Sequence, residues 1–417
     1  MYDMDKTIFP SYVKGDIEAP SSKSMTQRAI AAALLSDTET IIFNPSGCDD
    51  SKAALDIAAN LGAEIQTGLK KLKMRGTGKL KERKLCCGES GLAIRMFSPI
   101  AALHPYEITM TGFGSLKKRP MSMIEDALLQ LGAECDSAGG YIPLKIKGPI
   151  RGGKCTVDGS VSSQLLTGLL MALPLVSEDS EITVKNLKSK PYIDMTLQVL
   201  DKFGIKVQNT SYKLFNIRGN QKYHGVSFEV EGDWSGGAFL LVAGAVNGEV
   251  KIHGLRPDSR QSDKAILTAL NSAGARMRIK EDSIGISKSD LHSFKFDATE
   301  SPDLFPPLVA LAAYCKGISV IKGVSRLVHK ESDRALALRE EFGKMNISVE
   351  LKGNTMLVTG GEVRGATIDS HNDHRIAMAA AVTALRASGN VVIKNSDCVA
   401  KSYPAFFNDL KQIGVKV

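Results

Sequence analysis

The chain has 417 residues, of which 43% are hydrophobic and 24% charged, and its formal net charge at pH 7 is +8. This is the composition of an ordinary globular protein of two or three domains, and no apolar run reaches the roughly 18 residues of a membrane span. Residues 1–10 contain neither a signal-peptide core nor an Arg-rich transit pattern, and the seven cysteines are scattered. We therefore expect a reduced, cytoplasmic protein with no membrane association.

Eight of the basic residues lie between Lys70 and Lys84, around a Gly-Thr-Gly turn. This run has little aromatic interleaving, so we interpret it as a solvated hairpin rather than as a nucleic-acid-binding patch. The remaining cations stand singly in loops of small residues, a distribution that suits small anionic substrates.

One short phrase recurs along the whole chain: a helical stretch ends in a hydrophobic residue, a glycine follows, and a short strand comes next. The phrases are centred on six glycines 69 to 72 residues apart, which are Gly62, Gly132, Gly204, Gly274, Gly343 and Gly414. Such self-similarity indicates six structural units of about 70 residues each. We expect each glycine to adopt the left-handed turn that ends a helix.

Each unit is predicted to be a β/α mixture with one exposed and one buried helix. Apolar residues at three- and four-residue spacing predict amphipathic helices at 50–60, 121–130, 192–202, 261–272, 332–341 and 404–412. Helices that are apolar nearly all round, and therefore buried, are predicted at 29–35, 165–173, 238–246, 308–313 and 376–385. Strands such as 181–184 and 391–393 lie between them, so the fold class is α/β.

Polar loops of small residues open several of the buried helices. Residues 20–28 combine serines with Lys23 and Arg28, residues 87–95 are glycine-rich, and residues 159–164 contain three serines. Hydroxyl groups cap helices, and a helix N-terminus attracts anions. Each loop taken alone is equally well explained by ordinary capping or a structural turn.

Two charged motifs are more specific. In the segment 330–334, Glu331 lies between cations, where it could exchange protons while the cations hold an anion. In the segment 372–375, Arg375 stands at the mouth of an apolar helix and needs an anionic partner. Asp303 precedes another apolar stretch, either as a helix cap or as a carboxylate near buried surface. His371 and His374 have metal-ligand spacing, but no cluster of cysteines or carboxylates supports a metal site, and we predict none.

Together these blocks resemble the EPSP synthase family, the 3-phosphoshikimate 1-carboxyvinyltransferases. The motifs that carry the resemblance follow one another along the whole chain: Ser22-Lys23-Ser24 with Arg28, the glycine-rich loop up to Arg95, Lys118-Arg119-Pro120, Ser162-Ser163-Gln164, Ser189-Lys190-Pro191-Tyr192, Lys330 to Arg334, Asn372 to Arg375, and Ala400-Lys401. The chain departs from the family pattern at Glu89, Leu92, Met96 and Arg326.

The resemblance implies a fold of two similar globes, an inside-out α/β barrel with three β/α units per globe. It places residues 21–230 in the N-terminal globe and residues 1–20 with 231–417 in the C-terminal globe. It also implies two chain crossings that act as hinges and an active site in the cleft between the globes.

The implied reaction transfers the enolpyruvyl group of phosphoenolpyruvate to the 5-hydroxyl of shikimate 3-phosphate by addition and elimination, in chorismate and aromatic amino-acid biosynthesis. It requires no cofactor. The family expectation is a monomer whose partners are these two anionic substrates, with no nucleic acid and no membrane.

The resemblance also assigns roles to residues. Asp303 would be the base for the hydroxyl, Glu331 the proton donor to the methylene carbon, and Lys23 would assist. The residues implied to bind shikimate 3-phosphate are Lys23, Ser24, Arg28, Ser162, Ser163, Gln164, Ser189, Asp303, Arg326 and Lys330. The residues implied to bind phosphoenolpyruvate are Lys23, Gly91, Arg119, Gln164, Arg334, Arg375 and Lys401.

Two alternatives stay open at this point. A sister transferase that acts on UDP-N-acetylglucosamine shares the architecture but commonly uses a loop cysteine as its acid, and residues 112–120 contain none. A ring of repeats that binds nucleic acid would carry cations along one face of every exposed helix.

Overall fold

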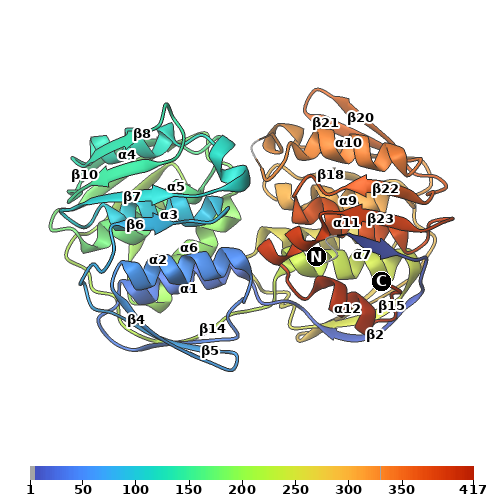
Figure 1. Cartoon of the computed structure of the whole chain (residues 1–417), viewed down its shortest axis with the longest axis horizontal. Coiled ribbons are helices and arrows are strands. Elements are labelled where there is room, and N and C mark those ends of the chain that lie inside the picture. The colour runs from blue at the N-terminus through green and yellow to red at the C-terminus, as the bar shows by residue number, and fades with distance from the viewer. Residues whose placement is uncertain (1–4, 329) are drawn as a thin grey trace. The chain divides into compact units, whose positions relative to one another are not determined.

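The computed structural model describes residues 5–328 and 330–417 (Figure 1). It divides into two compact units, here called the N-terminal unit (Ser21–Val230) and the C-terminal unit (Glu231–Val417 together with the chain up to Pro20). The part of the expected C-terminal globe that comprises residues 1–4 lies outside the described residues.

Three four-stranded sheets make up the N-terminal unit, and all three share one topology: a parallel pair is followed by two antiparallel neighbours. The sheets are β14 (Ser227–Glu229)-β3 (Thr40–Phe43)-β5 (Lys71–Gly76)-β4 (Ala63–Gly68), β6 (Lys84–Cys86)-β7 (Glu107–Thr111)-β9 (Leu144–Lys147)-β8 (Glu134–Ser137), and β10 (Gly153–Asp158)-β11 (Ser180–Lys185)-β13 (Leu214–Ile217)-β12 (Val207–Thr210).

The C-terminal unit repeats this topology twice, and its third sheet has the parallel pair with a single antiparallel neighbour. Its sheets are β2 (Val13–Glu18)-β15 (Gly248–His253)-β17 (Ser283–Ser287)-β16 (Arg276–Ile279), β18 (Lys295–Asp297)-β19 (Ile318–Lys322)-β21 (Thr355–Thr359)-β20 (Ser348–Lys352), and the three-stranded β22 (Ala366–Asp369)-β23 (Val391–Lys394)-β1 (Lys6–Ile8). The predicted α/β fold of six similar units is therefore confirmed.

Each sheet is accompanied by one buried and one amphipathic helix. The buried helices are α1 (Lys23–Leu34), α3 (Gly91–Ala101), α5 (Gln164–Ala172), α7 (Trp234–Asn247), α9 (Phe305–Ala312) and α11 (His374–Ala384). The amphipathic helices are α2 (Asp49–Asn60), α4 (Ser122–Gln130), α6 (Lys190–Lys202), α8 (Ile266–Ser272), α10 (Arg334–Lys344) and α12 (Phe406–Gln412). Helix α3 was not predicted, because its glycine-rich start and internal Pro99 are not typical of a helix.

The repeated glycines behave as predicted in five of six units. Gly62, Gly132, Gly204, Gly274 and Gly414 all have φ between 79° and 108°. The prediction is wrong for Gly343, which lies inside α10, and the left-handed residue there is Asn346, with φ 67°. Asparagine tolerates this conformation better than most residues, so in this unit the left-handed turn lies at Asn346, three residues after the glycine. The strand expected after Gly414 is also absent from the described structure.

The prediction that residues 70–84 form a hairpin with each other is wrong. β5 does form a hairpin, but with the preceding β4, and the connection is Leu69-Lys70. The Gly-Thr-Gly segment follows the end of β5, and β6 belongs to a different sheet.

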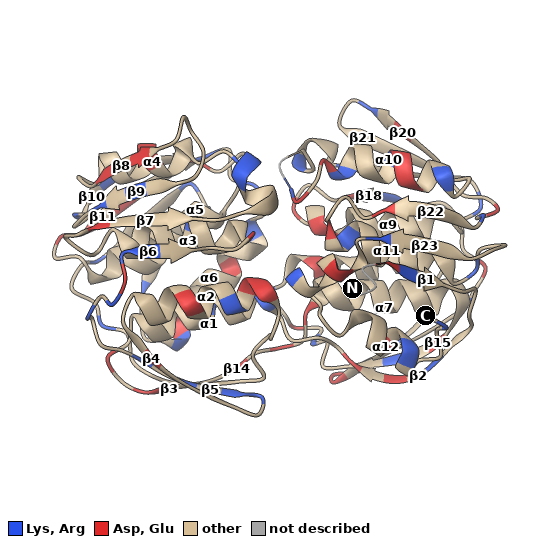
Figure 2. Cartoon of the chain, in the orientation of Figure 1, with Lys and Arg blue, Asp and Glu red and all other residues tan. Residues whose placement is uncertain are grey.

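Figure 2 shows where the charged residues lie on these elements. The buried helices α5, α7 and α9 carry no charged residue and are drawn entirely in tan. Among the amphipathic helices, α4 and α8 contain neither lysine nor arginine. The cation-lined face that the nucleic-acid ring hypothesis requires on every exposed helix is therefore absent from these two. In the described part of the chain, no helix has both the length and the apolarity needed to cross a bilayer.

Gly168 in α5 allows that helix to approach the backbone of α3. A Cβ atom at Gly168 would lie 2.5 Å from the carbonyl oxygen of Met96 and 2.9 Å from that of Arg95, whereas a Cβ atom at Gly343 would meet nothing within 4 Å. We predict that Gly168→Ala lowers the free energy of unfolding by about 1–3 kcal/mol through overpacking. Gly343→Ala, the control in an equally helical setting, should raise it by up to about 1 kcal/mol. Urea unfolding measures both changes, and the same sign for the two variants would contradict this account.

Candidate active site

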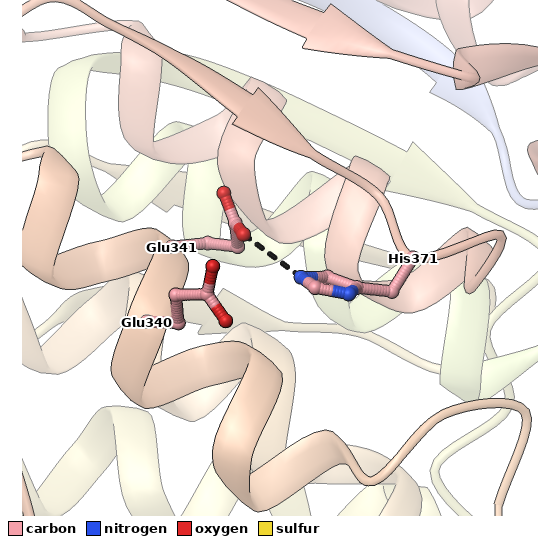
Figure 3. A group of neighbouring side chains, drawn as sticks. All are labelled: Glu340, Glu341 and His371. Carbon is pink, nitrogen blue, oxygen red and sulfur yellow. Dashed lines mark hydrogen bonds and ion pairs between the residues drawn. The ribbon is translucent and has the colours of Figure 1, made fainter.

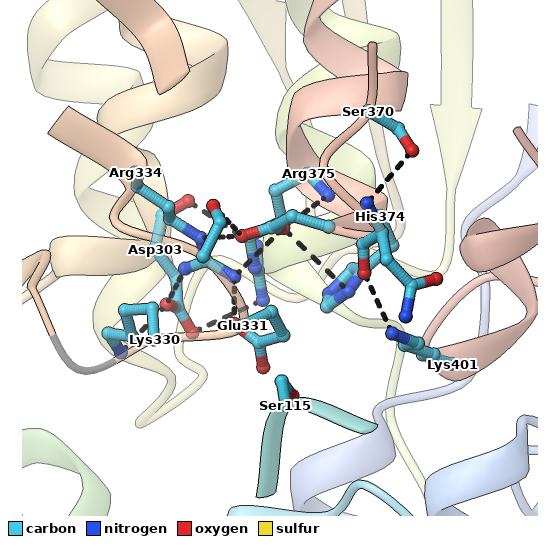
Figure 4. Close-up of polar contacts among 12 residues, drawn as sticks. Ser115, Asp303, Lys330, Glu331, Arg334, Ser370, His374, Arg375 and Lys401 are labelled. Carbon is cyan, nitrogen blue, oxygen red and sulfur yellow. Dashed lines mark hydrogen bonds and ion pairs between the residues drawn. The ribbon is translucent and has the colours of Figure 1, made fainter. Parts of the chain in front are cut away.

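A cluster of acids and cations lies where α10 and α11 begin in the C-terminal unit (Figure 4). Arg334, the first residue of α10, is only 1% exposed. Its Nε donates to Asp373 Oδ2 at 2.8 Å and its Nη1 donates to Asp303 Oδ1 at 2.8 Å, while Nη2 donates to Glu331. Asp373 also caps α11 by accepting the backbone N–H of Arg375 at 3.0 Å. One guanidinium thus joins three carboxylates.

Asp303 lies in the short 3₁₀ helix Pro302–Leu304 directly before α9, and three cations surround it. Lys330 Nζ donates to it at 3.0 Å and Arg375 Nη2 at 3.2 Å, in addition to Arg334. Burial raises the pKa of Asp303, but the charges of Arg375, Lys330 and Arg334 outweigh burial and hold the pKa well below its ordinary value. The carboxylate is therefore ionised at neutral pH.

The other predicted residues of this unit lie around the cluster. Lys401 is buried and donates from Nζ to the backbone carbonyl of Asn372 at 2.7 Å. Arg326 ends the 3₁₀ helix Val324–Arg326 and is half-buried. Burial lowers the pKa of Lys330, and the nearby charges of Arg334 and Arg326 lower it further against the opposing effect of Asp303.

Asp263 is a buried acid beside this cluster that the sequence analysis did not single out. It accepts hydrogen bonds from the hydroxyls of Ser235 and Ser262, the latter at 3.1 Å. Burial, together with the charge of Asp303, raises the pKa of Asp263 to about 6. In the sequence, Asp263 stands near the start of a predicted amphipathic helix and resembles an ordinary helix-terminal acid, so only the tertiary structure reveals its position.

In the N-terminal unit, the mouth of α1 holds the predicted residues Lys23, Ser24 and Arg28. Lys23 Nζ forms an ion pair with Asp50 Oδ2 at 2.8 Å. Arg28 is 1% exposed, and its Nη1 donates to the carbonyl of Ser24 at 2.9 Å.

The guanidinium of Arg28 is buried among neutral acceptors. Its Nε donates to Thr196 Oγ1 at 3.0 Å and its Nη2 to the carbonyl of Tyr192 at 3.2 Å. No carboxylate of the described residues lies within ion-pair distance of it, and burial lowers the pKa of Arg28 to about 10. An uncompensated buried cation is costly, so this environment favours an additional anion.

The start of α3 brings two arginines onto one glycine. A Cβ atom at Gly91 would lie 2.4 Å from Arg119 Nη1 and 3.0 Å from Arg95 Nη1. Arg95 Nη1 also donates to Gln164 Oε1 at 3.0 Å, and Gln164 is the first residue of α5. Gly91 therefore makes room for two guanidinium groups, one of which, Arg95, is held by α5.

The predicted serines occupy helix starts. Ser162 Oγ accepts the backbone N–H of Gln164 at 3.1 Å, and Ser163 is the N-cap residue of α5. Ser189 is the N-cap residue of α6 with a left-handed φ of 58°, a conformation that serine rarely adopts. Glu89, one of the departures from the family pattern, accepts the backbone N–H of Ser115 at 2.7 Å.

The structure thus brings the predicted site residues together in two sets. In the C-terminal unit, Asp303, Lys330, Glu331, Arg334 and Arg375 form one continuous network. In the N-terminal unit, Gly91, Arg119 and Gln164 meet around Arg95, whereas Lys23 pairs with Asp50. Asp373, at the centre of the first set, was part of a recognised motif but had been given no role.

Comparisons with known proteins all match the same family, and the matches cover almost the whole chain. The sequence profile of the family described as EPSP synthase (3-phosphoshikimate 1-carboxyvinyltransferase) matches residues 9–410. A 3-phosphoshikimate 1-carboxyvinyltransferase of Clostridium acetobutylicum is 40% identical over 422 residues, which cover 98% of this chain and 96% of that protein. One of Aeropyrum pernix is 37% identical, with 98% and 96% covered. A solved structure of EPSP synthase from Acinetobacter baumannii matches with a TM-score of 0.83 at 25% identity and covers 99% of both chains.

The raised pKa of Asp263 predicts a pH-dependent effect on stability. The pKa of Asp263 is about 6 in the folded protein and about 3.8 in the unfolded chain. Ionisation of Asp263 therefore destabilises the folded state as the pH rises through this interval. Asp263→Asn should therefore be more stable than the unsubstituted protein by about 2–3 kcal/mol near pH 7, and the gain should shrink toward zero near pH 4.

Urea unfolding at both pH values measures this difference. The control is Asp258→Asn, which removes an exposed acid whose pKa is lowered, chiefly by its hydrogen bond with Arg256, and which should give no gain at neutral pH. A stability change for Asp263→Asn that is the same at both pH values would contradict the prediction.

Proposed function

Because the chain belongs to the EPSP synthase family, we propose that it transfers the enolpyruvyl group of phosphoenolpyruvate to the 5-hydroxyl of shikimate 3-phosphate and releases phosphate. The observation that carries the residue assignments is the attachment of two carboxylates, Asp303 and Glu331, to the single buried guanidinium of Arg334. This arrangement supplies two proton-exchanging groups and the cationic environment that two anionic substrates need.

Arg334 and Arg375 are the proposed ligands of the phosphoenolpyruvate carboxylate. Arginine suits this role because its planar guanidinium binds a carboxylate through two parallel hydrogen bonds. Both arginines currently direct N–H donors at Asp303, so the incoming carboxylate would compete with Asp303 for them. Lys401, Arg119, Gln164 and Lys23 are proposed to bind the phosphate group, with Gly91 giving Arg119 its position.

This competition gives Asp303 a route to act as the base. In the free protein its pKa is held too low for efficient proton abstraction. When substrate anions take up donors of Arg375 and Arg334, Asp303 loses part of its positive surroundings and its pKa rises. Substrate binding would thus make the carboxylate basic at the moment when the 5-hydroxyl is present.

The proposed addition forms a bond between the 5-oxygen and C2 of phosphoenolpyruvate. The hydroxyl proton passes to Asp303, and Glu331 delivers a proton to the methylene carbon, with Lys23 assisting. In the elimination, Glu331 takes a proton back from the new methyl group, the C–O bond to phosphate breaks, and phosphate departs with the proton held by Asp303. The two steps balance and leave the protein unchanged.

Shikimate 3-phosphate is proposed to bind through groups of both units. Ser162, Ser163 and Ser189 would donate to its phosphate from helix starts, where N–H groups also face an anion. Ser24 and Arg28 would bind its carboxylate, which suits the Arg28 guanidinium because no carboxylate of the described residues pairs with it. The remaining proposed ligands of this substrate are Lys23, Gln164, Asp303, Arg326 and Lys330.

The alternative acceptor, UDP-N-acetylglucosamine, is not favoured, since the relatives that match nearly the full chain are named for shikimate 3-phosphate. We further propose that the protein works in the cytoplasm as a monomer, without nucleic acid.

Phosphate release from phosphoenolpyruvate tests the function directly. We expect release that depends on shikimate 3-phosphate and does not occur with UDP-N-acetylglucosamine. Asp303→Ala and Glu331→Ala should each lower kcat about 10²–10⁴-fold, because each removes a group that moves a proton. Asp297→Ala removes an exposed acid that forms an ion pair with Lys322 and accepts the backbone N–H of Thr299, and it should leave kcat unchanged. Release without shikimate 3-phosphate, or full activity of either of the first two variants, would refute the proposal.

Gly91→Ala tests the proposed phosphoenolpyruvate contacts. Its Cβ would displace the guanidinium of Arg119, which lies 2.4 Å from that position, so KM for phosphoenolpyruvate should rise about 10-fold or more. Gly47→Ala adds a methyl group where nothing lies within 4 Å, and it should not change KM. Steady-state kinetics at saturating shikimate 3-phosphate measure both, and equal KM values for the two variants would contradict the assignment.

A further inference from the structure

Glu341 is a buried carboxylate for which the proposed mechanism has no use. It lies in α10 seven residues after Arg334, and with 3.6 residues per turn the two side chains project from the same face of the helix. The Glu341 side chain is 1% exposed, so its charge needs partners within the fold. Its neighbour Glu340 projects to the surface and is 58% exposed.

The partners of Glu341 are Lys344 of its own helix and residues 369–373, which are the last residue of β22 and the turn that leads to α11 and are here called the loop. The backbone N–H of Asp369 donates to Glu341 Oε2 at 2.9 Å, and His371 Nε2 lies 2.8 Å from Oε1 (Figure 3). Lys344, one turn later in α10, donates to both oxygens at 2.8 and 2.9 Å. Glu341 thus joins its own helix to this loop.

The loop contains two consecutive residues with a left-handed backbone conformation. His371 and Asn372 both adopt left-handed backbone angles, with φ of 51° and 54°. The N–H of His371 donates to Asp369 Oδ1 at 2.7 Å, and the N–H of Asp373 donates to the carbonyl of Ser370 at 2.9 Å. Histidine and asparagine tolerate this conformation better than most residues, and hydrogen bonds both within the loop and to Glu341 hold it.

The far end of the same loop carries the contacts that hold the candidate active site. Asp373 accepts Arg334 Nε at 2.8 Å, and the carbonyl of Asn372 accepts Lys401 Nζ at 2.7 Å. The loop is therefore fixed to α10 at two points. At the first point, Arg334 of the helix pairs with Asp373 of the loop. At the second point, Glu341 of the helix contacts the side chain of His371 and the backbone N–H of Asp369.

Two acids and a histidine that lie close together could also bind a metal ion. Glu340, Glu341 and His371 offer one ligand atom each within 4.8 Å of one another. However, the ammonium group of Lys344 already contacts Glu341 and lies 3.3 Å from Glu340 Oε1. This cation occupies the acid pair, so the geometry favours a structural contact over a metal site.

We propose that Glu341 and His371 are positioning residues, which hold the loop 369–373 against α10 and thereby place Asp373, the Arg334 guanidinium and the carbonyl that binds Lys401. Neither residue touches a substrate in this account. The kinetic consequence rests on the proposed function, because Arg334 and Lys401 are its proposed ligands of phosphoenolpyruvate.

Glu341→Gln is the first test, with Glu340→Gln as its matched control on the adjacent residue. Glutamine preserves the shape of Glu341 but removes the charge that faces Lys344 and His371. We expect KM for phosphoenolpyruvate to rise about 10-fold in Glu341→Gln, with a much smaller change in KM for shikimate 3-phosphate. Glu340 pairs with the same lysine, but among the described contacts it has no hydrogen bond to residues 369–373, so Glu340→Gln should behave as the unsubstituted protein.

The loop side of the contact is tested at His371, which is 33% exposed and carries less risk to folding. His371→Asn keeps a residue that tolerates the left-handed backbone but is too short to reach Glu341, and it should raise KM for phosphoenolpyruvate as Glu341→Gln does. His371→Gln retains a donor that can reach Glu341 and should restore most of the affinity. If Glu341→Gln does not fold, these two variants decide the question.

Hydrogen–deuterium exchange of the segment 369–373 supplies a readout that does not depend on activity. We expect faster exchange in Glu341→Gln and His371→Asn than in Glu340→Gln. Unchanged exchange, or faster exchange with an unaltered KM for phosphoenolpyruvate, would overturn the positioning role. If the unsubstituted protein releases no phosphate with shikimate 3-phosphate, the proposed function fails, while the exchange data still test the contact itself.

Discussion

The buried guanidinium of Arg334 is the constraint on which the C-terminal unit depends. A cation that is 1% exposed is tolerated only where carboxylates replace the lost hydration, and here Asp303, Glu331 and Asp373 do so. These acids precede α9, α10 and α11 respectively. One side chain therefore fixes the starts of three helices, and the groups proposed to act on substrate are a direct result of how this charge is neutralised.

The same neutralisation sets the chemistry. Three cations keep Asp303 ionised and weakly basic in the free protein. In the proposed mechanism, a substrate carboxylate binds by taking over some of the hydrogen-bond donors of these cations. Binding and activation of the base are then one event. The N-terminal unit shows a complementary imbalance, since the buried Arg28 guanidinium donates to neutral acceptors and pairs with no carboxylate in the part of the chain that the structure describes. Both units thus contain buried cationic groups suited to anionic ligands. In the C-terminal unit protein carboxylates surround the cation, whereas in the N-terminal unit neutral acceptors do.

Sequence spacing was sufficient for the repeated architecture but not for the pairing within the site. The glycines at 69- to 72-residue intervals predicted six units because each marks a local event, the end of a helix. Gly343 departed from this rule because Asn346 could take over the left-handed turn. The contact of Arg334 with Asp373 spans 39 residues, and the burial of Asp263 arises only from packing, so neither leaves a local pattern. The family resemblance supplied residue roles that spacing alone left open.

The central claim is that substrate carboxylate competes with Asp303 for the arginine donors, and the ionisation of Asp303 tests it most directly. A carbon-13 NMR titration of labelled aspartate carboxyls, with Asp303 assigned by its loss in Asp303→Asn, would follow the pKa of Asp303 with and without phosphoenolpyruvate. The account predicts a pKa well below the ordinary value in the free protein and a rise when phosphoenolpyruvate binds. An ordinary pKa in the free protein, or one that phosphoenolpyruvate does not change, would contradict it.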